Sequence, residues 1–256
     1  MNWAIAAAGL IGGLMVGMTG MGGGALLTPM LILFFNVDPL SAVGSDLVVS
    51  LVMKPIGGGV HLRRGNVNKA MVGWLTVGSV PAAFTGVLLL KSLGGDASTA
   101  LKPLLGAVLL VAALAMIAKP AIQSRRKPSG TTIVAVDVRP GRTIAIGAVG
   151  GLLVGLTSVG SGSLIIVMLL LAYPTLLARE LVGTDLVQAI PLVAAAAFGH
   201  LLFGDVSFSL TGSLLVGGIP GVYIGARLSA GAPDRLLRPT LFVVLVSTGL
   251  KLVGAF

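Results

Sequence analysis

The chain carries the same apolar sequence pattern twice, and this duplication limits what it can fold into. Four elements of the first half return 138 or 139 residues later: the glycine-rich segments 17–24 and 155–162, Gly44–Leu47 and Gly183–Leu186, His61–Val67 and His200–Val206, and Gly78–Gly86 and Gly217–Gly225. A duplicated apolar chain with glycine-interrupted helices is typical of membrane transporters.

The composition leaves too little polar surface to coat a soluble protein. Hydrophobic residues make up 55% of the chain, charged residues 10%, and the mean hydropathy is +1.05, whereas soluble domains carry roughly 25% charged residues. The net charge is +9, and the basic residues lie between the apolar runs, as juxtamembrane charges do, so we expect no nucleic-acid partner.

No cysteine is present, which excludes disulfides and thiolate metal sites, and we expect neither a metal nor a cofactor. The segment Met1–Ile11 has no basic start, so we interpret it as the first membrane segment and not as a signal peptide.

The apolar runs predict an all-α polytopic membrane protein that forms a single transporter domain, 1–256. We expect a first repeat at about 1–118, a cytoplasmic linker at 119–142 that contains three prolines, and a second repeat at 143–256. The eight apolar stretches are Asn2–Phe35, Leu40–Val60, Ala70–Leu90, Lys102–Ala118, Thr143–Tyr173, Leu181–Phe203, Ser209–Ala230 and Pro239–Phe256.

The first and fifth stretches are too long for one straight membrane helix. A straight helix of about 30 residues would measure about 45 Å, against a hydrocarbon core of ~30 Å. Each stretch is therefore either a broken helix or a hairpin that enters and returns. Hairpins would place thirteen basic residues inside and two outside, whereas single crossings would give nine against six. The positive-inside rule favours hairpins, inverted repeats and roughly eight to ten membrane helices.

The duplicated glycine clusters are the first candidate binding site. A broken helix exposes backbone N–H groups and the positive end of a helix dipole inside the membrane, which suits a small anion. The alternative is close helix packing through small residues. The candidate anion-binding residues are Thr19, Gly20, Gly22, Gly23, Gly24, Thr157, Ser158, Ser161, Gly162 and Ser163.

Two aspartates stand at matching positions, Asp46 and Asp185. One interpretation makes Ser45 and Thr184 the N-caps of the next helices, with the aspartates in the first turn. The other makes the aspartates a proton or cation relay, because acids at membrane depth are costly and usually functional.

Other polar residues interrupt the apolar runs. Lys54 has Val193 as its repeat equivalent, so it breaks the symmetry; it either faces an anion or reaches the membrane surface. Gln188 is a candidate wall residue, one turn beyond Asp185. His61 and His200 either titrate with a proton gradient or cap helix ends.

Two functional motifs, a phosphate-binding loop and a serine–histidine dyad, each lack a residue that the motif requires. The segment that starts at Gly17 carries Gly23 where a phosphate-binding loop needs lysine. Ser161 and His200 are the only candidate intramembrane serine–histidine dyad, but Val159 occupies a position where that motif needs glycine. We therefore expect no enzyme.

These motifs, in order and doubled, resemble the sulfite exporter TauE/SafE family over essentially the whole chain. The resemblance rests on the cluster Gly20–Gly24 with Pro29, the G-[ST]-[DN]-L element at Gly44 and Gly183, the histidine followed by G-x-V, and the G-x-x-P-x-x-x-x-G pattern. It implies a multi-pass secondary transporter of the bacterial inner membrane. Its relatives move small anions, often sulfite, sulfoacetate or related sulfonates, with proposed proton coupling.

The resemblance and the residues together predict a carrier for a small anionic substrate. Its partners would be this substrate, the lipid bilayer and, in a homo-oligomer, further copies of the chain. Serines replace part of the second glycine cluster, at Ser158, Ser161 and Ser163, so the two halves of the site differ. A small-anion or small-solute channel is the first alternative. An intramembrane enzyme that uses Ser161 and His200 is the second.

Overall fold

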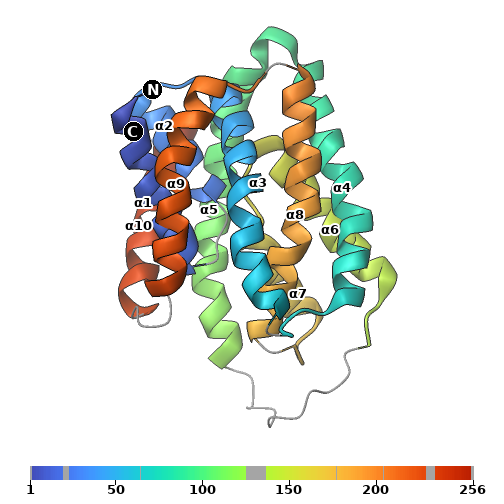
Figure 1. Cartoon of the computed structure of the whole chain (residues 1–256). Coiled ribbons are helices and arrows are strands. Elements are labelled where there is room, and N and C mark those ends of the chain that lie inside the picture. Colours follow the sequence, from blue (N-terminus) through green and yellow to red (C-terminus); the bar gives the residue numbers. More distant parts are fainter. Residues whose placement is uncertain are drawn as a thin grey trace.

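The computed structural model describes residues 2–19, 23–63, 65–124, 137–176, 178–203, 205–228 and 234–254. Side chains are not described at 19, 57, 60, 61, 119–124, 178, 179, 226 and 234–241. The chain forms a bundle of helices, and no strand occurs within these ranges (Figure 1). In order, the elements are α1 (Trp3–Thr19), η1 (Gly23–Ala25), α2 (Leu27–Phe35), α3 (Pro39–Arg63), α4 (Lys69–Ser92), η2 (Gly94–Asp96), α5 (Ala97–Ser124), α6 (Pro140–Thr157), α7 (Leu164–Ala172), α8 (Ala178–Phe203), α9 (Phe208–Leu228) and α10 (Asp234–Val253).

The helices confirm the predicted all-α membrane architecture. In the described part of the chain, six helices are long and apolar enough to cross a membrane: α3, α4, α5, α6, α8 and α9. The apolar parts of α1 and α10 are shorter, at Trp3–Met18 and Phe242–Val253. The remaining two, α2 and α7, have nine residues each, which is about 13 Å of helix and less than half of the ~30 Å hydrocarbon core.

Both long apolar stretches fold as hairpins. Asn2, before α1, and Val37, after α2, line the same surface pocket, so α2 returns to the side from which α1 enters (Figure 1). In the second half, the Tyr173 hydroxyl after α7 lies 2.5 Å from the Thr143 hydroxyl in the first turn of α6, and it accepts a hydrogen bond from the Arg139 backbone N–H. The hairpin alternative is therefore correct, and the tip of each hairpin lies inside the bundle.

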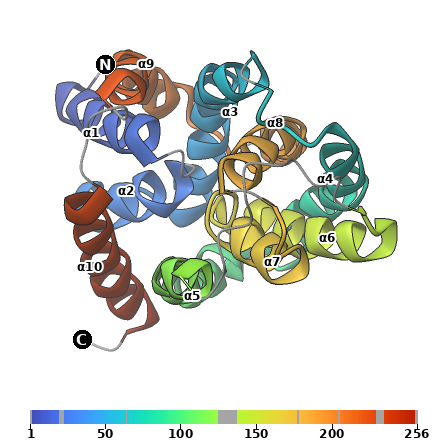
Figure 2. The same cartoon turned by 90° about the horizontal axis from the view of Figure 1, so that it is seen from below.

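Each hairpin packs its long arm against a helix of the other half of the chain, α1 against α9 and α6 against α4 (Figure 2). Glycines let these backbones touch. A Cβ on Gly217 would stand 1.8 Å from the carbonyl oxygen of Ala6, and one on Gly78 would stand 2.1 Å from that of Ile144. In lipid, where packing drives helix association, such contacts hold a bundle together.

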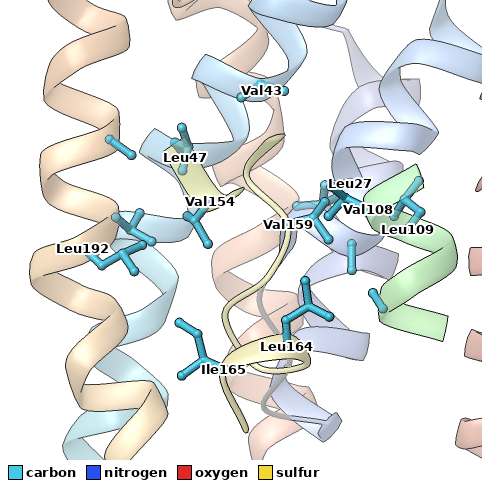
Figure 3. Packing of buried hydrophobic residues seen from close by; sticks show 14 of the residues in the cluster. Leu27, Val43, Leu47, Val108, Leu109, Val154, Val159, Leu164, Ile165 and Leu192 are labelled. Atoms are coloured by element: carbon cyan, nitrogen blue, oxygen red, sulfur yellow. The ribbon is translucent and has the colours of Figure 1, made fainter. Parts of the chain in front are cut away.

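Helices α3 and α8 pack against each other at the centre of the bundle, between the two hairpin units (Figure 2). Apolar side chains surround the α6–α7 loop here: Val159 lies near Leu27 and Val108, whereas Leu164 lies beside Ile165, and all five side chains are buried (Figure 3). The hairpin tip is thus held in a closely packed environment, which fixes the positions of its polar groups.

The linker is shorter than the predicted 119–142. Helix α5 continues to Ser124, and α6 already begins at Pro140. A helix can extend past the membrane on polar residues, and proline is favourable at the first position of a helix because it needs no hydrogen-bonded N–H there. The central linker residues, 125–136, lie outside the described ranges.

Candidate functional site

The loop between α6 and α7 is built to reverse the chain in a small space. Helix α6 ends at Ser158, which adopts a left-handed conformation with φ of 60° and donates its backbone N–H to the Val154 carbonyl oxygen at 2.7 Å. Gly160 and Gly162 follow with φ of 137° and 88°. Glycine tolerates these angles without steric cost, so the sequence favours a tight reversal at this point.

The two hairpin tips meet in the middle of the protein. A Cβ on Gly24, in η1 of the first hairpin, would stand 2.0 Å from the backbone oxygen of Ser158 in the second. A Cβ on Gly23 would stand 3.0 Å from Asp46 Oδ1 and 3.3 Å from Ser50 Oγ. The structure thus brings Gly24 against Ser158, and Gly23 against Asp46 and Ser50. Gly20 and Gly22 lie outside the described residues, as does the side chain of Thr19.

Lys54 points into this centre and not to the membrane surface. Its Nζ donates a hydrogen bond to Ser161 Oγ at 2.5 Å, and the side chain is 5% exposed. Its electrostatic neighbours are Asp185 on α8 and Asp46 on its own helix. The ammonium therefore sits beside the α6–α7 loop with a carboxylate on each of the two central helices.

Asp46 contacts the same loop. Its Oδ2 accepts a hydrogen bond from Ser158 Oγ at 2.5 Å, and the residue is fully buried. Its Oδ1 has no hydrogen-bond partner in the described part of the chain. The hydroxyl of Thr28, in the first turn of α2, neighbours this carboxylate and is likewise buried without a hydrogen-bond partner there.

The N-cap interpretation of Ser45 and Thr184 is wrong. Helix α3 begins at Pro39 and α8 at Ala178, so both hydroxyls lie inside helices. Asp38 performs the capping of α3 instead, because its Oδ2 accepts hydrogen bonds from the backbone N–H groups of Leu40 and Ser41. Asp46 and Asp185 therefore lie within their helices, away from the first turn.

The α8 side of the centre is also polar. Asp185 is 1% exposed and Gln188 is fully buried. Gln188 Nε2 donates to Ser79 Oγ on α4 at 2.6 Å, while its Oε1 has no hydrogen-bond partner within the described ranges. The amide of Gln188 thus presents an acceptor oxygen to the interior, as a wall residue would.

Thr157 and Ser163, at the two ends of the loop, differ in whether their hydroxyl groups already form hydrogen bonds. Thr157 Oγ1 donates to the Leu153 carbonyl oxygen at 2.7 Å and accepts from the Val159 N–H at 3.2 Å, so it shapes the end of α6. Ser163, directly before α7, is 6% exposed, and its Oγ has no hydrogen-bond partner among the residues described. Ser163 is therefore available to a ligand, and the Thr157 hydroxyl is already engaged.

His200 is not a surface residue, and its ring lies at a carbonyl group in the last turn of α6, where a capping side chain would lie. It is fully buried, with Nδ1 3.1 Å from Asp205 Oδ2 and Nε2 3.1 Å from the carbonyl oxygen of Gly155. Because Ser161 pairs with Lys54 and His200 with these two oxygens, no serine–histidine dyad forms. The side chain of His61 lies outside the described residues.

The described residues also contain polar contacts that sequence reasoning missed. Ser45 Oγ accepts a hydrogen bond from the backbone N–H of Ser207 at 3.1 Å, and Thr184 Oγ1 accepts one from the backbone N–H of Asn68 at 3.0 Å. The duplicated G-[ST]-D-L element contains both hydroxyls, so the repeat itself was the signal. Thr28 and Ser50 have no such signal, because neither has a polar residue at its repeat equivalent.

No group of three or more histidine, cysteine, aspartate or glutamate side chains that could hold a metal ion occurs among the described residues. The polar groups that do converge at the centre form what we call the central polar cluster. Its members are Thr28, Asp46, Ser50, Lys54, Ser79, Ser158, Ser161, Ser163, Asp185 and Gln188. The cluster holds one cationic side chain, two carboxylates and several hydroxyl groups, all of them buried.

Comparison with known proteins agrees with this architecture. The family model of the sulfite exporter TauE/SafE matches residues 5–252. The chain is 37% identical over 256 residues to "Probable membrane transporter protein YjnA" of Bacillus subtilis (strain 168), which covers 99% of this chain and 100% of that protein. It is 27% identical to YdhB and 29% identical to YtnM of the same organism, both also named probable membrane transporter proteins; these matches cover 94% and 96% of this chain, and 96% and 79% of those proteins.

No solved structure matches the chain. The matching family, the relatives and the six membrane-length helices make this a multi-pass membrane transporter, located in bacteria in the inner membrane, and not an enzyme. The chain belongs to the sulfite exporter TauE/SafE family.

Proposed function

We propose that the protein is a secondary transporter that moves a small anion, a sulfur oxyanion or organosulfonate such as sulfite or sulfoacetate, together with protons. The observation that carries this proposal is the buried ammonium of Lys54, held 2.5 Å from the Ser161 hydroxyl at the tip of a membrane hairpin. A lysine in that position costs desolvation energy, and attraction of an anionic substrate gives a reason for that cost.

The α6–α7 loop supplies the other donors that an anion needs. Ser163 Oγ has no hydrogen-bond partner in the described chain, and it stands at the start of α7. The N-terminal end of a helix carries a partial positive charge. An oxyanion between Lys54, Ser161 and Ser163 would therefore meet a full charge, hydroxyl donors and a helix dipole together. A sulfonate or sulfite presents three oxygens, enough to use all three donors.

The charges of the central polar cluster support coupling to a proton. With Lys54, Asp46 and Asp185 all ionised, the three side chains carry one net negative charge before any anion enters. A second negative charge in a buried site is unfavourable unless a cation accompanies it. A proton on Asp46 Oδ1 would donate to Thr28 Oγ1 and satisfy both of these buried oxygens.

The arrangement of the two halves supports inverted repeats that rock against each other, with the linker in the cytoplasm. The contact of Gly78 with Ile144 has its counterpart in the contact of Gly217 with Ala6, at residue offsets of 139 and 138. The hairpins start from opposite ends of the bundle (Figure 1). Inverted halves around a central site are a common basis of alternating access.

A channel is the alternative, and the contacts at both ends of the central polar cluster favour a carrier. Ser45 binds Ser207 on the side of the N-terminus, and Thr184 binds Asn68 on the side of the linker. A channel needs a route that is continuous when it conducts. A conformation with a hydrogen-bonded contact at both ends is instead expected of a carrier between its two open states.

Counterflow in proteoliposomes tests the proposal. Vesicles are loaded with sulfite, sulfoacetate, sulfolactate, thiosulfate, sulfate or acetate, and a labelled tracer of the same anion is supplied outside. A carrier accumulates the tracer transiently with one sulfur oxyanion or sulfonate and not with acetate. If purified, folded protein gives counterflow with none of these anions, the anion proposal fails. Tracer equilibration without accumulation would favour the channel.

A further inference from the structure

Two hydrogen bonds at opposite ends of the bundle are repeat equivalents of each other. In the first, Ser45 Oγ on α3 accepts from the backbone N–H of Ser207, just before α9; in the second, Thr184 Oγ1 on α8 accepts from the backbone N–H of Asn68, just before α4. Residues 45 and 184 are separated by 139 positions, and so are 68 and 207. We call the first contact the N-terminal latch and the second the linker-side latch.

The local geometry of the two latches is also the same. Asn68 caps α4 by accepting from the Met71 N–H at 3.0 Å, and Ser207 stands before α9 with its Oγ 3.5 Å from the Leu210 N–H. In each latch a hydroxyl inside a central helix therefore binds the residue directly before the helix that packs against it. The four residues lie on elements that belong to different halves of the chain, α3 with α9 and α8 with α4.

Each latch lies next to an aspartate of the central polar cluster, on the side of the start of its central helix. Ser45 directly precedes Asp46, and Thr184 directly precedes Asp185. Outside the N-terminal latch lies a surface cavity of about 390 Å³, lined in part by Asn2, Asp38, Ser41, Ser207 and Ser213. Ser207 thus belongs both to the wall of this cavity and to the latch, so opening the latch would extend the cavity toward Asp46.

We propose that the substrate route runs along the α3–α8 interface, and that Ser45 and Thr184 are the gate residues at its two ends. This inference rests on the proposed transport function. Each latch consists of hydrogen bonds between one hydroxyl group and one residue, and such bonds make only a small net contribution to stability, so either latch can open at a modest cost. With both latches formed, the central polar cluster is closed at both ends. Opening one at a time gives alternating access.

The competing explanation is purely structural: the hydroxyls satisfy N–H groups that every helix leaves unpaired at its start. The two explanations differ in sidedness. Loss of a structural contact loosens the bundle for reagents from both sides. Loss of a gate contact shifts the population toward the state that is open on that side only, and closes the other.

The cysteine-free chain permits a direct test of sidedness. A single reporter, Ser50→Cys, is placed in the central polar cluster on α3, where Ser50 is 3% exposed. A membrane-impermeant thiol reagent is applied to vesicles of each orientation, so labelling is measured separately from the N-terminal side and the linker side. The gate variants are Ser45→Ala and Thr184→Val. The matched control is Ser41→Ala, which lines the same cavity but forms no latch.

The gate inference predicts opposite effects of the two variants. Ser45→Ala raises the labelling rate several-fold from the N-terminal side and lowers it from the linker side; Thr184→Val does the reverse. Ser45→Thr and Thr184→Ser keep the hydroxyl and label as the parent does, and Ser41→Ala changes neither rate. Unchanged rates, or a rise from both sides in either variant, would overturn the inference. So would loss of folding in both gate variants while the hydroxyl-keeping variants fold and label normally.

This labelling requires no substrate, so its result separates the two proposals. A sided response with no anion counterflow would retain the gates and reject the anion. Counterflow without a sided response would retain the transporter and reject the gates.

Discussion

The Nζ atom of Lys54 lies 2.5 Å from the Oγ atom of Ser161, and both side chains are buried in the middle of a membrane protein. The contact joins α3 to the tip of the hairpin formed by α6 and α7. It has no counterpart in the other half, because the repeat equivalents of Lys54 and Ser161 are Val193 and Gly23. The two halves therefore contribute different groups to this contact, which would suit a substrate with one charged end.

Replacing Lys54 with methionine should weaken anion binding while the bundle stays folded. Methionine keeps the length of the side chain but removes the positive charge. Hydrogen bonds to charged groups contribute about 1.5–3 kcal/mol, so we expect roughly a 10- to 150-fold rise in the Kd of the transported anion. The measurement is concentration-dependent counterflow. Lys251→Met, at an exposed lysine in the last turn of α10, is the control and should leave the Kd unchanged. An unchanged Kd in Lys54→Met would show that the anion does not bind at Lys54 and the α6–α7 loop.

Asp46→Asn should separate exchange from proton-driven accumulation. Asparagine resembles the protonated aspartate, and its amide oxygen can still accept the hydrogen bond of Ser158. We expect anion-for-anion counterflow to persist, because no proton needs to leave the site, and pH-gradient-driven accumulation to disappear. Both are measured in the same proteoliposomes, with Asp96→Asn, at an exposed aspartate of η2, as the control. Full gradient-driven accumulation in Asp46→Asn would exclude Asp46 as the proton carrier.

Much of the fold follows from sequence because hydrophobic run length and charge report directly on membrane crossing. Basic residues such as Arg179 and Arg227 favoured the hairpin prediction, because the side of the membrane on which they lie depends on whether the glycine-rich stretches return. The apolar stretch that begins at Leu40 lies one residue from the start of α3, whereas the N-cap interpretation of Ser45 placed that start too late. Gly44 interrupts an apolar run and suggests a helix end, whereas Asp38 and Pro39 begin the helix several residues earlier. Local propensity is a weak guide where tertiary packing decides.

The candidate site was predictable in its outline but not in its pairings. Glycine clusters, Lys54 and the two aspartates stand out because polar and helix-breaking residues are rare in apolar runs. Which serine each charged group contacts depends on how α3 docks against the α6–α7 loop, and a sequence pattern carries no such register. Thr28 is the clearest omission, because a single threonine before Pro29 looks like any helix start.

Gly24→Ala should disrupt the meeting of the two hairpin tips. The new methyl group would stand 2.0 Å from the backbone oxygen of Ser158, and a backbone atom cannot move aside cheaply. We expect a destabilisation of at least the ~1–3 kcal/mol typical of overpacking, together with loss of transport. The matched control is Gly73→Ala on α4, where no atom lies within 4 Å of the added carbon. There alanine should be neutral or stabilise the helix by up to about 1 kcal/mol. Thermal unfolding of both variants in the same detergent measures this, and equal midpoints would contradict the close contact.

Single cysteines after α2 and after α7 should lie on opposite sides of the membrane. Asn36 follows the first hairpin and Thr175 the second, and both are exposed. With the linker in the cytoplasm, Asn36→Cys should react with an impermeant thiol reagent added to intact cells. Thr175→Cys should react only after the membrane is opened. The cysteine-free parent sets the background for both. Labelling of both positions from outside, or of neither, would contradict inverted halves, since two parallel halves place these loops on the same side.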